Sequence, residues 1–227
     1  LSNNAKLITN NIKKITVVDF NDLDSVSGKF DWIFSCYTET SRGYKISIKK
    51  LKKKAEKLKS RIMLDATASI GLEVNHDFAD VIGYSSCKGL FGLTGAAFIA
   101  FNDPPQNEVN SFYMNLRNHI ERKMTGPYHA ICSLFETLKS HEKYKYSVIK
   151  NKKKFLNKFN KFISVPKENQ PLICTYTTCA IFSKTNKAIL YKPRNLNNGS
   201  IVCHLGEAHL KDSAKGNLVN LLEIENI

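Results

Sequence analysis

The sequence has no apolar stretch as long as the roughly 18 residues that a membrane-spanning helix requires. It also does not open with a secretory signal. Its six cysteines form no CxxC pair and no Cys/His spacing typical of a metal site. These absences argue against a membrane protein and against a metal centre. We expect a cytoplasmic protein with reduced, mostly buried thiols.

Acidic residues are scarce, since 20 Asp and Glu stand against 34 Lys and Arg, for a formal net charge of +14. A charge of this size is typical of proteins that bind nucleic acid. The lysines, however, gather in the segments 49–61 and 150–162, where apolar residues such as Leu51 and Leu58 recur at helical spacing. This pattern is typical of the solvated faces of amphipathic helices. With no recognisable binding motif, a nucleic-acid-binding module is the less favoured alternative.

The first hundred residues alternate between apolar runs and helical patterns. Five apolar runs have the length of buried strands, and they lie at 13–20, 31–38, 61–67, 79–85 and 95–101. A lysine-rich helix is expected at 45–60. Strands this apolar are typical of a sheet covered by helices on both faces. We therefore expect an α/β fold with a mainly parallel sheet.

The pattern changes after residues 102–106. Helical segments are expected at about 107–122 and 129–162, β-strands at 171–183, 188–193 and 200–206, and a last amphipathic helix at about 207–223. The sequence therefore predicts two domains. Residues 1–140 are expected to form an α/β domain, which the resemblance given below implies is the C-terminal part of a larger domain, and residues 141–227 a small α+β domain.

Lys88 differs from the other lysines because small and apolar residues surround it in SSCKGLFGLTG, residues 85–95. A lysine becomes a useful nucleophile when burial or nearby positive charge disfavours its ammonium form. The glycines let a ligand approach the backbone closely, and Ser85 and Ser86 suit hydrogen bonds to a phosphate. The alternative is a loop lysine that points to water.

Asp65 ends the apolar run RIMLD, residues 61–65. Open α/β sheets place their ligands at the carboxyl ends of their strands. A carboxylate in that position, flanked by Thr67 and Ser69, suits a site that holds a positively charged ring nitrogen. The alternative role for Asp65 is a helix cap.

Together, MLDATASIGLE and ADVIGYSSCKGLFGLTGAAFIAF resemble the cofactor segment of class V aminotransferases, which are fold-type-I enzymes that use pyridoxal 5′-phosphate. They are most similar to the 2-aminoethylphosphonate–pyruvate transaminase branch. The resemblance implies that Lys88 carries the cofactor covalently and moves the substrate proton, that Asp65 pairs with the ring nitrogen, and that Thr67 packs on the ring. These residue types suit the implied roles. A protonated ring nitrogen lets the ring accept the electrons freed when the Cα proton leaves, and a neutral lysine amine is a general base.

Two further segments resemble motifs of the same family. TETSRG, residues 38–43, is similar to ETTTG, which implies that Thr40 lies near the ring hydroxyl. KMTGPYH, residues 123–129, is similar to FTPPTH, which implies that Thr125 reaches the cofactor phosphate of a neighbouring subunit in a homodimer. The matches occur in the family's order.

The resemblance also has departures. The family's phosphate-binding Gly/Ser turn is expected before Leu1 and so lies outside this sequence; phosphate usually sits on backbone amides at such a helix start. CHLG places His204 where the family has the arginine of FRIG. A histidine cannot offer a bidentate fork, so we expect substrate binding by His204 or by Arg194. The alternative for His204 is a hydrogen-bonded histidine within a strand.

The sequence therefore predicts a pyridoxal-phosphate-dependent aminotransferase. It is expected to move an amino group between a small amine of the 2-aminoethylphosphonate type and a 2-oxo acid such as pyruvate. A truncated, non-catalytic remnant of the same fold is the main alternative.

Overall fold

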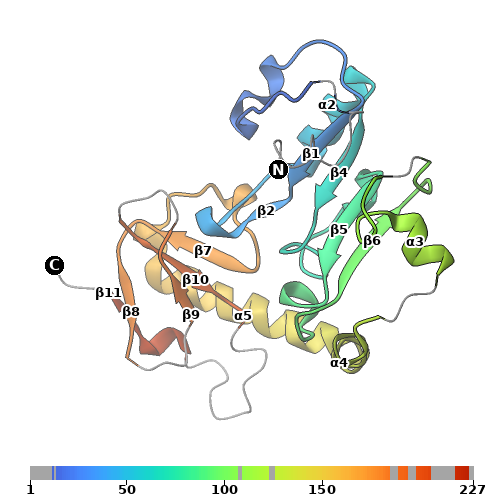
Figure 1. Ribbon diagram of the computed structural model, residues 1–227. Helices are drawn as coiled ribbons and strands as arrows, with labels where there is room; N and C mark the ends of the chain where they lie inside the picture. The colour runs from blue at the N-terminus through green and yellow to red at the C-terminus, as the bar shows by residue number, and fades with distance from the viewer. Residues whose placement is uncertain are drawn as a thin grey trace.

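The computed structural model describes residues 12, 14–106, 109–122, 126–184, 189–193, 198–205 and 218–224. Its larger sheet has the strand order β1-β4-β5-β6 (Figure 1). These strands are β1 (Trp32–Cys36), β4 (Arg61–Asp65), β5 (Val81–Ser85) and β6 (Ala97–Phe101). β4 pairs in parallel with β1 and β5, and β6 is antiparallel to β5. The expected α/β fold with a mainly parallel sheet is confirmed.

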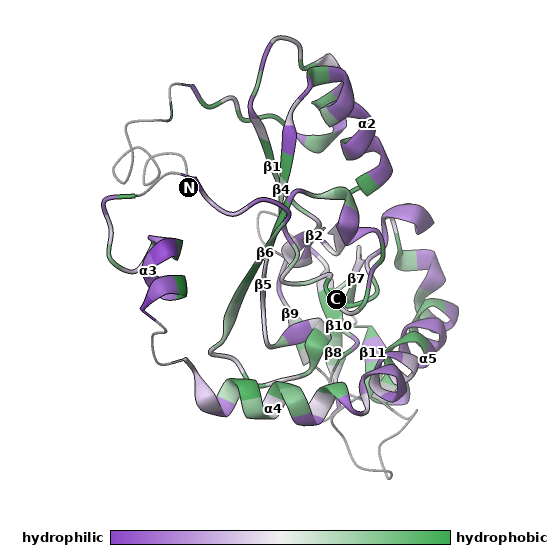
Figure 2. Ribbon diagram, turned by 90° about the vertical axis from the view of Figure 1, so that its right-hand side faces the viewer, coloured by the Kyte–Doolittle hydropathy of each residue, from purple (hydrophilic) through white to green (hydrophobic). Residues whose placement is uncertain are grey.

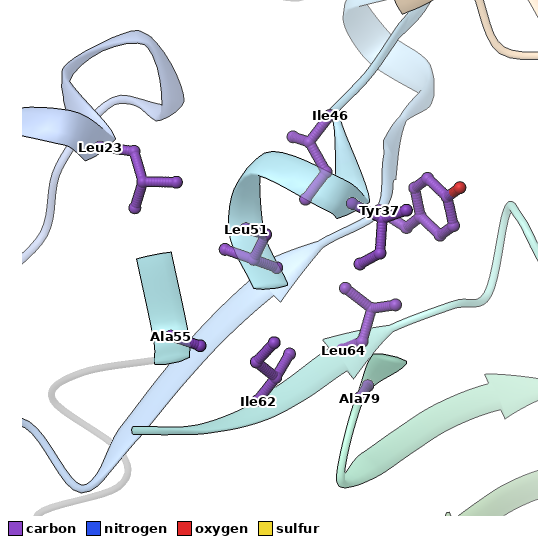
Figure 3. Close-up of a cluster of buried hydrophobic side chains, with 9 residues drawn as sticks. Leu23, Tyr37, Ile46, Leu51, Ala55, Ile62, Leu64 and Ala79 are labelled. Atoms are coloured by element: carbon purple, nitrogen blue, oxygen red, sulfur yellow. The ribbon is translucent and has the colours of Figure 1, made fainter. Parts of the chain in front are cut away.

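Helix α2 (Ile48–Leu58) covers one face of this larger sheet. It begins where the Ser47 side chain accepts a hydrogen bond from the Lys50 N–H, as a helix cap does. It ends at Lys59, which has a left-handed backbone. Its buried residues are spaced three and four apart, and they pack with residues of β4 into the cluster shown in Figure 3. Burial of this apolar stripe stabilises the helix more than its lysine-rich composition does.

The other face of the larger sheet, which we call the open face, carries apolar side chains that are 37% to 53% exposed. They are Trp32, Phe34, Met63 and Ile99. Strand register places Phe34 beside Met63 and Ile99 beside Gly83. Helix α3 (Leu116–Glu121) lies on the opposite side of the sheet from α2 (Figure 2), and none of its six described residues is buried.

The C-terminal part of the chain packs around the long helix α5. Its other elements are α4, a three-stranded antiparallel sheet of order β7-β10-β9, and the pair β8 and β11. The bounds are α4 (Tyr128–Leu138), α5 (His141–Phe159), β7 (Cys174–Thr177), β8 (Ile181–Ser183), β9 (Ile189–Tyr191), β10 (Ser200–Cys203) and β11 (Leu222–Ile224). α5 buries Val148, Phe155 and Phe159 in two clusters with these strands. The predicted boundary at 140/141 falls between α4 and α5, and the domain division stays a prediction.

Short elements connect these parts. The hairpin strands are β2 (Thr38–Glu39) and β3 (Tyr44–Lys45). The 3-10 helices are η1 (Phe20–Ser25), η2 (Thr40–Arg42), η3 (His76–Phe78), η4 (Lys88–Leu90), η5 (Asn160–Phe162), η6 (Lys167–Asn169) and η9 (Leu218–Leu221). Within the described ranges, no helix is both long and apolar enough to cross a membrane.

Three expected elements differ from the structure. Residues 14–19 have no regular structure and Val17 is exposed, so the strand predicted at 13–20 is wrong. The helix predicted at 107–122 is limited to α3, because the Asn115 side chain caps its start. Residues 222–224 form β11 against β8 instead of continuing the last predicted helix. Residues 206–217 lie outside the described part.

Candidate functional site

Asp65 ends β4 with its side chain on the open face, in one row with Cys36 and Gly83 of the neighbouring strands. Its Oδ1 accepts a hydrogen bond of 2.9 Å from the Thr67 N–H, as in an Asx turn. No described heavy atom lies within 4 Å of the position that a Cβ on Gly83 would take. Asp65 therefore has local backbone support and open space beside it.

Lys88 begins η4, directly after β5, with a left-handed backbone of φ 54°. A residue other than glycine adopts this conformation only when its surroundings hold it there. The loop is closed on both sides of Lys88 by bonds from Gly92 N–H to the Ser86 carbonyl and from the Ser86 hydroxyl to the Leu93 carbonyl. The Lys88 side chain is exposed. Lys88 therefore does not have the dry surroundings that its sequence neighbours predict, although Gly89 and Leu90 beside it are buried.

Cys36 ends β1 beside Asp65 in the register of the sheet. Burial, together with the negative charges of Asp65 and Glu39, raises the pKa of Cys36 to about 11, and the positive charge of Lys88 acts to lower it. The charges of Asp65 and Lys88 therefore act on one thiol at the carboxyl end of β1. The parallel neighbours β1, β4 and β5 end at the same edge of the sheet, which is where ligands bind in open α/β sheets.

The two serines before Lys88 have different surroundings. The Ser85 hydroxyl lies 3.0 Å from Cys87 Sγ. Ser85 is half-buried and pairs with Ala97 of the neighbouring strand β6. Ser86 is fully buried, and its hydroxyl donates to the Leu93 carbonyl and accepts from the Ala96 N–H. Ser86 thus closes the loop and cannot also face a phosphate. This corrects its expected role.

The remaining expected cofactor residues lie in different environments. Thr67 is half-buried and follows Asp65 directly. Thr40 is half-buried at the start of η2, where its carbonyl accepts a 3.8 Å contact from Cys174 Sγ. Thr125 and Arg194 lie outside the described residues.

His204 is fully buried and reaches no surface. Its Nε2 lies 2.8 Å from the Thr175 hydroxyl, and its ring packs 5.3 Å from that of Phe155. Burial, together with the charge of Lys152, lowers the pKa of His204 to about 3. Among the described residues its Nδ1 has no hydrogen-bond partner. His204 as placed is an interior residue, and this corrects its expected role in binding substrate.

Residues of α4 and α5 that the sequence did not single out hold the Lys88 loop. Ser133 accepts the Leu93 N–H at 3.1 Å, and Thr137 donates to the Leu90 carbonyl at 3.1 Å. His141 Nε2 lies 2.9 Å from the Gly89 carbonyl. The spacing of Ser133 and Thr137, one helical turn apart beside buried Leu134, is the only sequence signal for this role.

No protein-family model and no curated protein matches this sequence. Solved structures do. An alanine–glyoxylate aminotransferase from Nostoc sp. matches with a TM-score of 0.56 and 18% identity, over 65% of this chain and 46% of that one. A ureidoglycine–glyoxylate aminotransferase from Bacillus subtilis matches with 0.60 and 13%, over 89% and 66%. A phosphoserine aminotransferase from Cytophaga hutchinsonii matches with 0.62 and 13%, over 86% and 64%.

This chain has the fold of these aminotransferases. It spans 46% to 66% of their lengths. The expected fold, that of pyridoxal-phosphate-dependent transferases, is thereby confirmed.

Proposed function

We propose that this chain is part of a pyridoxal-phosphate-dependent aminotransferase in which Lys88 and Asp65 are the central residues. One observation carries the proposal. Asp65 ends β4 and Lys88 follows the next strand of the sheet, β5, at the carboxyl edge of a mainly parallel sheet, where open α/β sheets place their ligands. The fold that this chain shares with solved aminotransferases also supports the proposed amino transfer. Together they favour amino transfer over a nucleic-acid-binding module.

The residues present fit pyridoxal 5′-phosphate. Asp65 has one oxygen on the Thr67 N–H and a second oxygen to hold a proton on a ring nitrogen. The open space at Gly83 leaves room beside Asp65 for a flat ring, and the exposed Lys88 amine is available to bond the carbonyl carbon. Thr67 and Thr40 would frame the ring, and Ser85 would approach the phosphate. When bound, this cofactor supplies an electron sink for the substrate's reacting carbon.

The side chains of this chain would then handle the proton of the reaction. The Lys88 amine would accept the substrate Cα proton as a general base and return it as a general acid. The Asp65 carboxylate would accept a hydrogen bond from the ring nitrogen and so hold a proton there. Thr125 would reach the phosphate in a homodimer, as the resemblance implies.

We propose a small amine as donor and a 2-oxo acid as acceptor. 2-Aminoethylphosphonate with pyruvate is the first pair to assay. The donors and acceptors in the names of the similar proteins, alanine, phosphoserine, ureidoglycine and glyoxylate, form the comparison panel. Arg194 stays the proposed partner of the substrate's acidic group, and His204 is no longer part of the proposal.

Attachment of the cofactor tests the central assignment without any assay of turnover. The chain is mixed with pyridoxal 5′-phosphate, reduced with borohydride, digested and analysed by mass spectrometry. We expect the label on the peptide with Lys88, and no specific label in Lys88→Ala. Lys59→Ala is the matched control, because Lys59 is also exposed and has a left-handed backbone of φ 55°. Equal labelling of both variants would contradict the assignment.

Asp65→Asn separates attachment from chemistry. An asparagine still offers an oxygen to the Thr67 N–H but lacks the charge that keeps the ring nitrogen protonated. We expect normal labelling at Lys88 and amino transfer slower by on the order of 10²–10³-fold, as when one charge-stabilising group is removed from an active site. Labelling without any amino transfer in the unsubstituted chain would favour the non-catalytic remnant.

A further inference from the structure

Cys174, the first residue of β7, and Cys203, the last residue of β10, lie directly opposite each other in the antiparallel sheet (Figure 1). Cys174 is buried, Cys203 is half-buried, and the structure has both as thiols. All six cysteines lie in the described ranges, and within these ranges no other two are register partners. Strand pairing therefore brings together two thiols that are far apart in the sequence.

The type of register pair determines how close the two sulfur atoms can come. The N–H of His204, directly after Cys203, donates to the carbonyl of Ile173, directly before Cys174. A bond between these flanking residues makes Cys174 and Cys203 a non-hydrogen-bonded pair. In such a pair the Cα atoms are about 4.5 Å apart and the two side chains lie on the same face. A disulfide joins Cα atoms that are about 4.4–6.8 Å apart, so the backbone already holds the two cysteines where a disulfide can form.

Cys174 also contacts the candidate site. Its thiol donates to the Thr40 carbonyl at 3.8 Å, and Thr40 is one of the residues proposed to frame the cofactor ring. Close packing at Gly43, where an added Cβ would lie 2.6 Å from the Tyr176 nitrogen, keeps the end of η2 against β7. A sulfur atom in a disulfide carries no hydrogen. Oxidation of Cys174 would therefore remove this donor from the Thr40 carbonyl.

We propose that Cys174 and Cys203 form a reversible dithiol–disulfide pair that reacts with small disulfides such as oxidised glutathione, and that its oxidation weakens the η2 side of the candidate site. The redox pair itself needs no cofactor. Only its effect on the site rests on the proposed function.

The reaction proceeds by two thiol–disulfide exchanges. The half-buried Cys203 reacts first, because a small disulfide can reach it more easily than the buried Cys174. Its thiolate attacks one sulfur of the small disulfide, the S–S bond breaks, and one small thiol leaves. Cys174 then loses its proton and attacks the Cys203 sulfur, and the second small thiol leaves. Two protein thiols are oxidised while one small disulfide is reduced to two thiols.

The second exchange is expected to be the slower one. Burial, together with the negative charge of the Cys203 thiolate, raises the pKa of Cys174 to about 12. A thiol must lose its proton before it attacks a disulfide. Oxidation should therefore pass through a form in which Cys203 carries the small thiol before the two protein sulfurs join.

Mass spectrometry of the unsubstituted chain tests the pair. The protein is incubated with oxidised glutathione, the remaining thiols are blocked with N-ethylmaleimide, and the chain is digested with trypsin. Trypsin releases Cys174 on residues 168–184 and Cys203 on residues 195–211. We expect these two peptides to be joined, and the link to be lost on reduction with dithiothreitol. Glutathione on Cys203 with no link to Cys174 after prolonged incubation would overturn the proposal.

Cys179 provides the matched control. It is half-buried and lies on the same tryptic peptide as Cys174, but it is not a register partner of Cys203. Cys179→Ser should keep the link and Cys174→Ser should abolish it. A link that persists in Cys174→Ser would contradict the assignment. Fragmentation of the joined peptides from the unsubstituted chain identifies the linked cysteine without any variant, so the test does not depend on the folding of Cys174→Ser.

Attachment of pyridoxal 5′-phosphate to Lys88 tests the effect on the site. The attachment is trapped with cyanoborohydride, which leaves disulfides intact. We expect attachment to be at least twofold slower in the linked chain than in the reduced chain. Cys203→Ser, which keeps Cys174 and its bond to Thr40, should show no such difference after the same treatment. An equal rate in both states of the unsubstituted chain would contradict the effect through Thr40. A link that forms without any attachment in either state would contradict the proposed function and support the redox pair.

Discussion

Replacing Glu73 with glutamine tests what holds the larger sheet against the C-terminal part of the chain. One oxygen of Glu73 accepts a hydrogen bond of 2.7 Å from Lys45 Nζ, and the other accepts one of 2.7 Å from the Leu172 N–H. The Glu73 side chain is 8% exposed and that of Lys45 is 24% exposed. This carboxylate therefore joins β3, the loop after β4 and the segment before β7.

The expected loss follows from these two contacts. The ion pair with Lys45 contributes about 1–2 kcal/mol, since it is mostly shielded from water but Lys45 keeps some contact with solvent. A hydrogen bond from an N–H to a carboxylate contributes about 1 kcal/mol more than one to a neutral amide. Glu73→Gln should therefore lower the free energy of unfolding by about 2–3 kcal/mol. Glu73→Ala should cost about 1–3 kcal/mol more, because it leaves the Leu172 N–H without an acceptor.

Urea unfolding followed by circular dichroism measures these differences. Glu136→Gln is the control, because Glu136 also accepts a 2.7 Å bond from a lysine, Lys139, but both side chains are more than half exposed. Its expected effect is below about 0.5 kcal/mol. A double-mutant cycle with Lys45→Met isolates the ion pair. If Glu73→Gln costs no more than Glu136→Gln, the argument from burial is wrong.

Three further predictions follow from the same packing. Leu51→Ala should lower the free energy of unfolding by about 2–5 kcal/mol, because Leu51 is 1% exposed; a loss below that of the exposed Leu93→Ala would refute this. Gly43→Ala should destabilise by more than about 1 kcal/mol in the same assay, because Gly43 has a φ of 58° and an added Cβ would lie 2.6 Å from the Tyr176 nitrogen. The pKa of His204 is about 3 in the folded chain and about 6.5 when unfolded. As the pH falls, His204 is therefore protonated in the unfolded chain before it is protonated in the folded chain. The free energy of unfolding should fall as the pH drops from about 6.5 toward 3. Equal pH dependence in His204→Gln would contradict this last prediction.

Local patterns in the sequence were sufficient for the elements around the site. The apolar runs that became β1, β4, β5 and β6 were located within a few residues, since their period and length are properties of the segment itself. The same holds for α2, where Leu51 and Ala55 show the helical stripe. Asp65 at the end of β4 and Lys88 after β5 followed directly from these strands and from the resemblance.

Other outcomes depended on partners that are distant along the chain. Among the described residues, no strand pairs with residues 14–19, so the apolar composition of this run did not by itself make it a strand. The predicted last helix ended at about residue 223, but residues 222–224 form β11, because β8 supplies the pairing. The helix predicted from residue 107 is interrupted because the Asn115 side chain bonds to the backbone N–H of Arg117.

Side-chain roles were the hardest to foresee. Ser86 suits a phosphate by its residue type, yet its hydroxyl is occupied by Leu93 and Ala96. His204 lies in the interior just after β10 and meets Thr175, and Glu73 bonds to Leu172 far along the chain. A sequence specifies which groups a residue can offer and, through its period, the element that carries it. Long-range packing decides which of those groups form hydrogen bonds inside the protein and which stay available to a ligand. A buried polar group bonds to whichever partner the folded chain brings within reach.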